Sequence, residues 1–242
     1  MPKYFFKPQQ LHGNTVQLYE ETAHHLLHVL RAREGEMIML CDGAGTDYHA
    51  TIEQINAKKL LLECKITRQS PSLTEPPTKI TLYQGLPKGD KLETIIQKCV
   101  ELGVYEIIPV VTSRSVARAK NDTKKTIRYQ RIAESAAGQS MRGIIPKINE
   151  PLNLTAAAQQ LENAHFSLVA YEEEKEYSLK SALSQHLNKN INLWIGPEGG
   201  FTKEEIDTLT ALGAVTVTLG PRILRTETAA IAILAQVLCL IE

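Results

Sequence analysis

The sequence predicts a mixed α/β protein with two domains, a small β-rich domain over residues 1–72 and a larger domain with a mainly parallel sheet over residues 73–242. Three observations lead to this fold class. The chain has 242 residues, a length that allows one large α/β domain or two smaller domains and favours two. Three prolines interrupt regular structure between Ser70 and Pro77. Strand-like and helix-like segments alternate after that interruption.

The composition is that of a folded globular protein, with 43% hydrophobic and 22% charged residues. Lys and Arg total 27, and Asp and Glu also total 27, so attraction to nucleic acid must come from local clusters. The four cysteines are scattered without a C-x-x-C pair, which favours a reducing compartment. No stretch resembles a signal peptide or a membrane span. We therefore expect a cytoplasmic protein.

The first domain contains short β-prone runs at residues 37–40, 48–52 and 60–66, separated by turn signals such as Asp42–Gly45. One helix is expected from Thr22 to Arg33, with Thr22 as its N-cap and Gly35 just past its end. This pattern predicts a small β-barrel that one helix interrupts.

The second domain alternates between the two patterns, with strands expected at 80–83 and 106–111 and helices at 91–102 and 124–140. Asp90 and Glu93, like Thr202 and Glu205, have the spacing of a capping box at a helix start. Gly103 stands where a left-handed C-terminal cap belongs. The alternation predicts a sheet with helices on both faces.

Two glycine-containing loops each follow an expected strand. The strand at 191–195 enters Gly196–Phe201, and the strand at 215–219 enters Gly220–Thr228. In open α/β sheets ligands bind beyond the carboxyl ends of strands, and glycines let the backbone approach a ligand closely. The dinucleotide spacing G-x-G-x-x-G is absent, and Gly85–Lys91 lacks the ending of a phosphate loop, so NAD and ATP lose support. Composition alone leaves both tight turns and a polar site open.

Together the two loops closely resemble the paired signature of the RsmE-type methyltransferases of the SPOUT superfamily, which modify N3 of a uridine in small-subunit (16S) ribosomal RNA. The residues that carry the resemblance are Gly196–Phe201 and Leu219–Ala229. Three further segments, His24–Arg31, Asp42–Gly45 and Arg131–Ser140, also look like that family. The likeness therefore extends over most of the chain.

The resemblance implies a PUA-like RNA-binding barrel followed by a SPOUT domain whose chain forms a deep trefoil knot. It also implies an obligate homodimer and a bent S-adenosylmethionine cofactor held by the two loops. The implied cofactor-binding residues are Ala170, Tyr171, Ile195, Gly196, Pro197, Gly200, Leu219, Gly220, Ile223, Leu224 and Thr228.

Methylation of N3 of uracil requires loss of the N3 proton, so the site should hold a general base or stabilise the uracil anion. Arg225 stays protonated and could stabilise the anion, but it cannot be the base. Glu198 could accept the proton, or it could be a structural carboxylate that accepts backbone N–H bonds within its turn. Both possibilities for Glu198 are open.

Local clusters of basic residues indicate where RNA phosphates could bind, although a solvated charged surface explains much of the same pattern. The candidates are Lys3, Lys7, Arg31, Arg33, Arg114 and Arg142. His24 and His28 would share a helix face, but no further ligand completes a set, so we expect no metal.

Two other functions compete with uridine-N3 methylation. The chain could be a knotted methyltransferase that acts on another RNA position, such as a ribose 2′-hydroxyl. It could instead be a non-catalytic RNA-binding factor in ribosome assembly. The glycine loops favour an enzyme, because a pure binding module needs no methyl-donor pocket.

Overall fold

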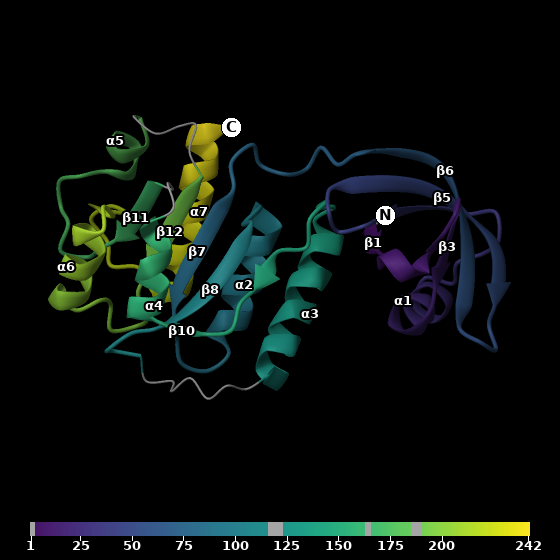
Figure 1. Ribbon diagram of the computed structural model, residues 1–242, viewed down its shortest axis with the longest axis horizontal. Coiled ribbons are helices and arrows are strands. Elements are labelled where there is room, and N and C mark those ends of the chain that lie inside the picture. Colours follow the sequence, from purple (N-terminus) through teal and green to yellow (C-terminus); the bar gives the residue numbers. More distant parts are fainter. Residues whose placement is uncertain (1–2, 116–122, 163–165, 185–189) are drawn as a thin grey trace. The chain divides into compact units, whose positions relative to one another are not determined.

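The computed structural model describes residues 3–115, 123–162, 166–184 and 190–242, which form two compact units (Figure 1). Unit 1 holds the chain up to Glu75 together with Ala137–Ile145. Unit 2 holds Pro76–Ala136 and Pro146–Glu242. A single boundary at residue 72 does not describe this division, because the segment Ala137–Ile145 returns to unit 1.

Unit 1 is built on a six-stranded sheet with the order β1-β4-β5-β6-β3-β2. Its strands are β1 (Lys3–Phe5), β2 (Leu11–His12), β3 (Thr15–Leu18), β4 (Met37–Cys41), β5 (Thr46–Asn56) and β6 (Leu61–Pro71). The pair β1–β4 is parallel and the other pairs are antiparallel. Alternate residues such as Leu18, Ile52 and Leu62 point inward and are fully buried, as the two-residue period of a strand requires.

The helix of unit 1 begins earlier than the sequence predicts. Helix α1 (Glu20–His24) continues directly into a π-helical turn, η2 (His25–Val29), and Tyr19 rather than Thr22 precedes its first residue. Arg31 has a left-handed backbone, with φ of 56°, so the chain leaves the helix there, before Gly35. The expected N-cap at Thr22 is therefore wrong, since Thr22 lies inside the first turn.

Unit 2 is built on a parallel sheet with the order β10-β8-β7-β12-β11-β13, and β9 also pairs with β8. The strands are β7 (Ile80–Gly85), β8 (Glu106–Val111), β9 (Lys147–Ile148), β10 (Leu152–Asn153), β11 (Phe166–Ala170), β12 (Ile191–Ile195) and β13 (Val215–Val217). Every named pair is parallel, so all the carboxyl ends meet at one edge of the sheet.

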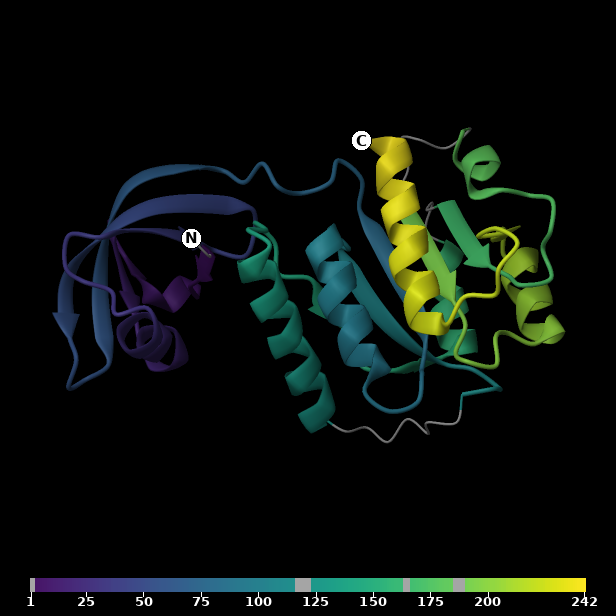
Figure 2. The same cartoon turned by 180° about the vertical axis from the view of Figure 1, so that it is seen from behind.

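Helices cover both faces of this sheet, which confirms the predicted layers. Helices α4 (Leu154–Ala158) and α6 (Lys203–Ala211) pack on the face seen in Figure 1, and α2 (Lys91–Leu102) and α7 (Thr226–Ile241) on the face seen in Figure 2. The remaining helical segments are η1 (Pro8–Gln10), α3 (Thr123–Gln139), η3 (Gln159–Glu162) and α5 (Leu179–Leu183). Trp194 on β12 is fully buried and stacks on Tyr83 of β7 at 4.1 Å between ring centroids.

Only one of the two predicted capping boxes forms. The Thr202 hydroxyl accepts the Glu205 N–H at 3.3 Å, and the Glu205 carboxylate accepts the Thr202 N–H at 2.9 Å. Asp90 makes no side-chain cap, because its ψ of 10° departs from the extended backbone that a capping residue needs. Gly103 does end α2 in the left-handed conformation, with φ of 111°.

Within the described ranges no helix is long and apolar enough to cross a membrane. The same residues contain no group of three or more His, Cys, Asp or Glu side chains placed to hold a metal ion.

Candidate active site

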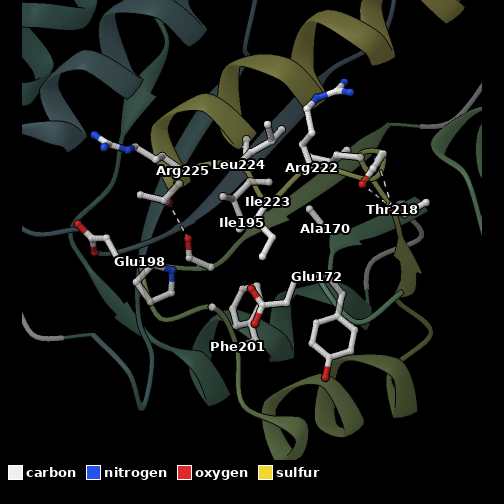
Figure 3. A pocket seen from close by; sticks show the side chains of 18 of the residues that line it. Ala170, Glu172, Ile195, Glu198, Phe201, Thr218, Arg222, Ile223, Leu224 and Arg225 are labelled. Carbon is white, nitrogen blue, oxygen red and sulfur yellow. Dashed lines mark hydrogen bonds between the residues drawn. The ribbon is translucent and has the colours of Figure 1, made fainter. Parts of the chain in front are cut away.

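A cavity of about 370 Å³ lies in unit 2 at the carboxyl ends of β11, β12 and β13 (Figure 3). Its walls come from the ends of those strands, the two glycine-containing loops and the start of α7. This volume is within the range of small-molecule sites, and the location follows the rule for open parallel sheets.

Nearly all of the cofactor-binding and catalytic residues predicted from the sequence line this cavity. They are Ala170, Tyr171, Ile195, Gly196, Pro197, Gly200, Leu219, Gly220, Ile223 and Leu224, together with Glu198 and Arg225. Thr228 is the exception, because it is exposed on α7 and does not belong to the lining. Thr226 lines the cavity instead. The cavity lining therefore gives no support to the cofactor contact predicted for Thr228.

The walls are largely apolar, and glycine backbones shape the openings between them. Ile195, Phe201 and Leu224 surround the cavity from two different loops and a strand end (Figure 3). A Cβ at Gly196 would lie 2.9 Å from the Gly200 Cα, so this loop folds back on itself only with glycine at that position. An apolar cleft with exposed backbone groups suits a flat heteroaromatic ligand.

A buried hydrogen-bond chain ties the ends of β7 and β12 to the start of α7. The Thr226 hydroxyl donates to the Gly196 carbonyl oxygen at 2.6 Å and accepts from Gln84 Nε2 at 2.8 Å. Gln84 and Thr226 are 0% and 5% exposed. The sequence does not predict that either residue belongs to the site. Gln84 appears there only as a polar residue at the end of an apolar strand, and Thr226 only as a polar residue at the start of an apolar helix.

Lys91, the first residue of α2, joins two carboxylates beside the cavity. Its Nζ lies 2.9 Å from Glu198 Oε1 and 3.6 Å from Glu227 Oε2. Glu198 also accepts the backbone N–H of Lys88 at 3.1 Å. The sequence of Gly85–Lys91 excludes a phosphate loop but does not predict these contacts of Lys91.

These contacts shift the pKa values of both partners. Partial burial works to raise the pKa of Glu198, but the hydrogen bonds from Lys91 and from backbone N–H groups outweigh it and hold that pKa below 4.5. The hydrogen bond to Glu198 raises the pKa of Lys91 above 10.5. Both groups are therefore charged at neutral pH, and Glu198 is a poor proton acceptor there.

Arg225 immediately precedes α7 and is exposed at the rim of the cavity. Its carbonyl oxygen accepts the Ala229 N–H at 2.8 Å, which fixes the backbone. In the part of the chain that the structure describes, its guanidinium has no hydrogen-bond or ion-pair partner. Arg225 is thus a cation that is free to meet a ligand.

Two of the six residues expected to bind RNA are buried in ion pairs within unit 1. Lys3 is 3% exposed, with its Nζ 2.7 Å from Asp47 Oδ1. Arg142 is 2% exposed and pairs with Glu75, which also accepts the Gly143 N–H at 2.8 Å. A phosphate cannot reach cations held in this way, so the predictions for Lys3 and Arg142 are wrong.

The other four expected RNA-binding residues, Lys7, Arg31, Arg33 and Arg114, are exposed. Arg114 also donates from Nη1 to the Gly199 carbonyl oxygen at 2.7 Å and packs against Gly199. It therefore supports the loop after β12 while its side chain remains at the surface.

Comparison with known families gives two matches along the chain. Residues 74–238 match the RNA methyltransferase domain family, and residues 18–64 match the RNA methyltransferase PUA domain family. These matches agree with the resemblance drawn from the sequence motifs.

Individual relatives cover nearly the whole chain. Ribosomal RNA small subunit methyltransferase E of Bacillus subtilis is 38% identical over 239 residues, which is 95% of this chain and 93% of the relative. A crystal structure of ribosomal RNA small subunit methyltransferase E from Neisseria gonorrhoeae bound to S-adenosyl methionine is 35% identical, with a TM-score of 0.85 over 98% of this chain and 96% of that one. A putative methyltransferase from Legionella pneumophila in complex with the same cofactor is 30% identical, with a TM-score of 0.86 over 98% and 96%.

Proposed function

Because the chain belongs to the RNA methyltransferase family whose curated relatives are named ribosomal RNA small subunit methyltransferase E, we propose that it methylates N3 of a uridine in small-subunit ribosomal RNA. The chain is an S-adenosylmethionine-dependent enzyme that acts on ribosomal RNA. The observation that carries the assignment is the cavity at the carboxyl edge of the parallel sheet, which all the predicted cofactor residues except Thr228 line.

The residues present fit S-adenosylmethionine. Ile195, Phe201 and Leu224 offer apolar surfaces to an adenine ring, and the backbone around Gly196 and Gly220 offers polar groups to a ribose. When bound, the cofactor supplies a methyl group on a positively charged sulfonium. Two relatives with the same arrangement of the chain were solved with this cofactor, which supports the same occupant here.

Arg225 stabilises the reacting uracil. Loss of the N3 proton spreads negative charge over O2 and O4 of the base, and a guanidinium that stays protonated lowers the free energy of that anion. Arg225 lines the cavity and has no side-chain partner within the described ranges, so it is available for this task. Glu198 is a wall residue rather than the base, because Lys91 and the Lys88 N–H already occupy its carboxylate.

RNA docks through exposed cations outside the cavity. Lys7, Arg31 and Arg33 on unit 1 and Arg114 on unit 2 are placed at the surface, where they can contact phosphates. Position N3 is occupied in a base pair, so the target uridine must be unpaired or flipped out before it reacts.

The functional form is a symmetric homodimer in the cytoplasm, where ribosomal RNA is found. Ile223, in a loop that lines the cavity, is 86% exposed, and Leu240 near the end of α7 is 37% exposed. Large exposed apolar side chains of this kind are typical of an interface, and closed two-fold symmetry is the commonest arrangement. Light scattering should give twice the monomer mass, and a monomer at working concentration would contradict this proposal.

The decisive experiment maps the modified nucleoside. Purified protein, labelled S-adenosylmethionine and unmethylated small subunits should yield 3-methyluridine at one position in the RNA. A ribose 2′-O-methyl product would favour another target chemistry, and binding without transfer would favour the assembly-factor alternative.

Arg225→Ala should lower kcat by about 10²-fold, as loss of an oxyanion-stabilising donor does. Arg33→Ala should raise KM for RNA and leave kcat intact.

A further inference from the structure

We propose that Lys91 is a positioning residue that keeps Arg225 available for the substrate by pairing with two carboxylates beside the cavity, Glu198 and Glu227. The inference rests on the proposed role of Arg225 in stabilising the uracil anion. In this role Lys91 acts on the reaction through Arg225, in addition to any contribution to the fold or to cofactor binding.

The geometry joins three elements at one ammonium group. Lys91 begins α2, Glu198 lies in the loop after β12, and Glu227 lies in the first turn of α7. The side chains of Lys91, Glu198 and Glu227 are 33%, 30% and 21% exposed, so the group is partly shielded from water. An ion pair in that setting is screened less than one on an open surface.

The location of Lys91 argues for a specific task. A cation in the first turn of a helix is unfavourable, because the backbone dipole places partial positive charge there. Lys91 nevertheless begins α2, and two carboxylates from other elements compensate it. Glu227, by contrast, occupies the favourable end of α7 for an anion.

The carboxylates outnumber the ammonium group. Glu227 Oε2 is buried and accepts no hydrogen bond within the described ranges, and its contact with Lys91 Nζ is a longer 3.6 Å. Arg225 is only two residues away along the chain, and its guanidinium is unpaired in the same described part. Within the described ranges Lys91 is therefore the only cation beside Glu227, and removing it would leave this partly shielded carboxylate without one.

Arg225 would take the place of Lys91 beside these carboxylates if the lysine were removed. A guanidinium binds a carboxylate through two parallel hydrogen bonds, whereas an ammonium group acts as a point charge. Once released, Glu198 or Glu227 would pair with Arg225 and withdraw it from the uracil. The cavity walls would remain, because the Thr226–Gly196 hydrogen bond that joins the two loops does not involve Lys91.

The test uses Lys91→Met in the full-length protein, assayed for methyl transfer to small subunits and for S-adenosylmethionine binding by calorimetry. We expect kcat to fall by about tenfold or more while the cofactor Kd changes by less than about threefold, as for an interaction that acts only in the transition state. Adding Glu198→Gln and Glu227→Gln should restore kcat to within about threefold of wild type, since a neutral amide does not hold Arg225 as a carboxylate does. Lys91→Arg should retain activity.

Lys98→Met is the matched control. Lys98 lies on the same helix and also pairs with a glutamate, Glu101, at 2.9 Å, but it is away from the cavity. This variant should behave as wild type. Thermal unfolding of each variant separates loss of activity from loss of fold.

Two results would overturn the inference. One is a further loss of kcat on adding the glutamine substitutions, and the other is a parallel loss of cofactor affinity in Lys91→Met; both indicate a merely structural lysine. Failure of the role proposed for Arg225 gives a different result. In that case the Arg225→Ala variant, which still contains Lys91, would keep its turnover. If Arg225→Ala is inactive and the two glutamine substitutions do not restore kcat to Lys91→Met, only the role proposed for Lys91 is contradicted.

Discussion

The hydroxyl of Thr226 lies 2.6 Å from the carbonyl oxygen of Gly196 and joins the start of α7 to the loop after β12. The two residues are 30 positions apart in the chain. Since Gln84 donates to the same hydroxyl at 2.8 Å, the end of β7 is held in the same arrangement. This chain of hydrogen bonds fixes the back of the cavity before any ligand enters it.

Thr226→Val should weaken both the fold and the cofactor site. The substitution keeps the shape of the side chain but leaves the Gly196 carbonyl and the Gln84 amide without their partner, which costs about 1–3 kcal/mol in a buried setting. Urea unfolding with and without S-adenosylmethionine measures both effects. Thr226→Ser keeps the hydroxyl and serves as the control. Equal stability of the valine and serine variants would show that the hydrogen bonds contribute nothing.

Gly220→Ala should reduce cofactor affinity through its backbone. Gly220 has φ of 107°, and an added Cβ would meet no protein atom within 4 Å. The effect of alanine on cofactor affinity therefore comes from backbone strain and from contact with the ligand, and not from crowding within the protein. Gly213 has φ of 88°, is equally open and lies outside the cavity lining. Both alanine variants should lose about 1–3 kcal/mol of stability, as for a side chain in the left-handed region. Only Gly220→Ala should weaken S-adenosylmethionine binding in calorimetry, and an equal loss in both would count against the pocket.

The Lys91–Glu198 pair should stabilise the fold only between acid and strongly alkaline pH. The pKa of Glu198 is below its ordinary value of 4.5, so its contribution is present above pH 4.5 and is lost as the pH falls through the folded-state pKa. The pKa of Lys91 is above its ordinary 10.5, so its contribution is lost only as the pH rises through that higher value. The stability difference between wild type and Glu198→Gln should be constant from about pH 6 to 8 and shrink in acid.

The same variant tests the chemistry of Glu198. If Glu198 is a wall residue, Glu198→Gln should keep the rise of kcat with pH that deprotonation of uracil N3 produces. A loss of about 10²-fold or more with a flattened pH profile would instead identify Glu198 as the general base.

Arg142→Met should lower stability rather than RNA affinity. The substitution leaves the partly buried Glu75 without its cation, which costs about 3–5 kcal/mol in the free energy of unfolding. Arg31→Ala, at an exposed position, should leave stability nearly unchanged and reduce the salt slope of RNA binding by about 0.7 to 0.9, one phosphate contact. Filter binding at several salt concentrations and thermal unfolding measure the two properties. Weak RNA binding by a fully stable Arg142→Met would restore the original assignment.

Local pattern predicted the regular elements of unit 2 closely. The expected bounds of α2, β8 and β12 agree with the structure. Apolar periodicity and the glycines that end helices are local signals, which depend only on residues close together in the sequence. Asp90 shows the limit of that reasoning. It has the spacing of a capping box, yet the turn that leads into α2 sets its ψ at 10° and prevents the cap.

Lys3 and Arg142 show the same limit for charge. A sequence places a cation in the chain but not its partner, and the partners here lie 44 and 67 residues away, at Asp47 and Glu75. Burial converted two expected RNA contacts into structural ion pairs, because a desolvated cation requires a nearby anion.

By itself the sequence determined the family, the order of the elements and which loops line the cavity, since those properties reside in contiguous motifs. The tertiary structure decided which side chains meet. It placed Thr226 rather than Thr228 in the cavity wall, and it brought Lys91 to Glu198 and Glu227 from three separate elements. Parallel strands collect their carboxyl ends at one edge, but the register of each strand and the turn that leaves it set the direction of every side chain there. Hydrogen bonds and ion pairs depend on those directions to within an ångström, and no local pattern specifies them.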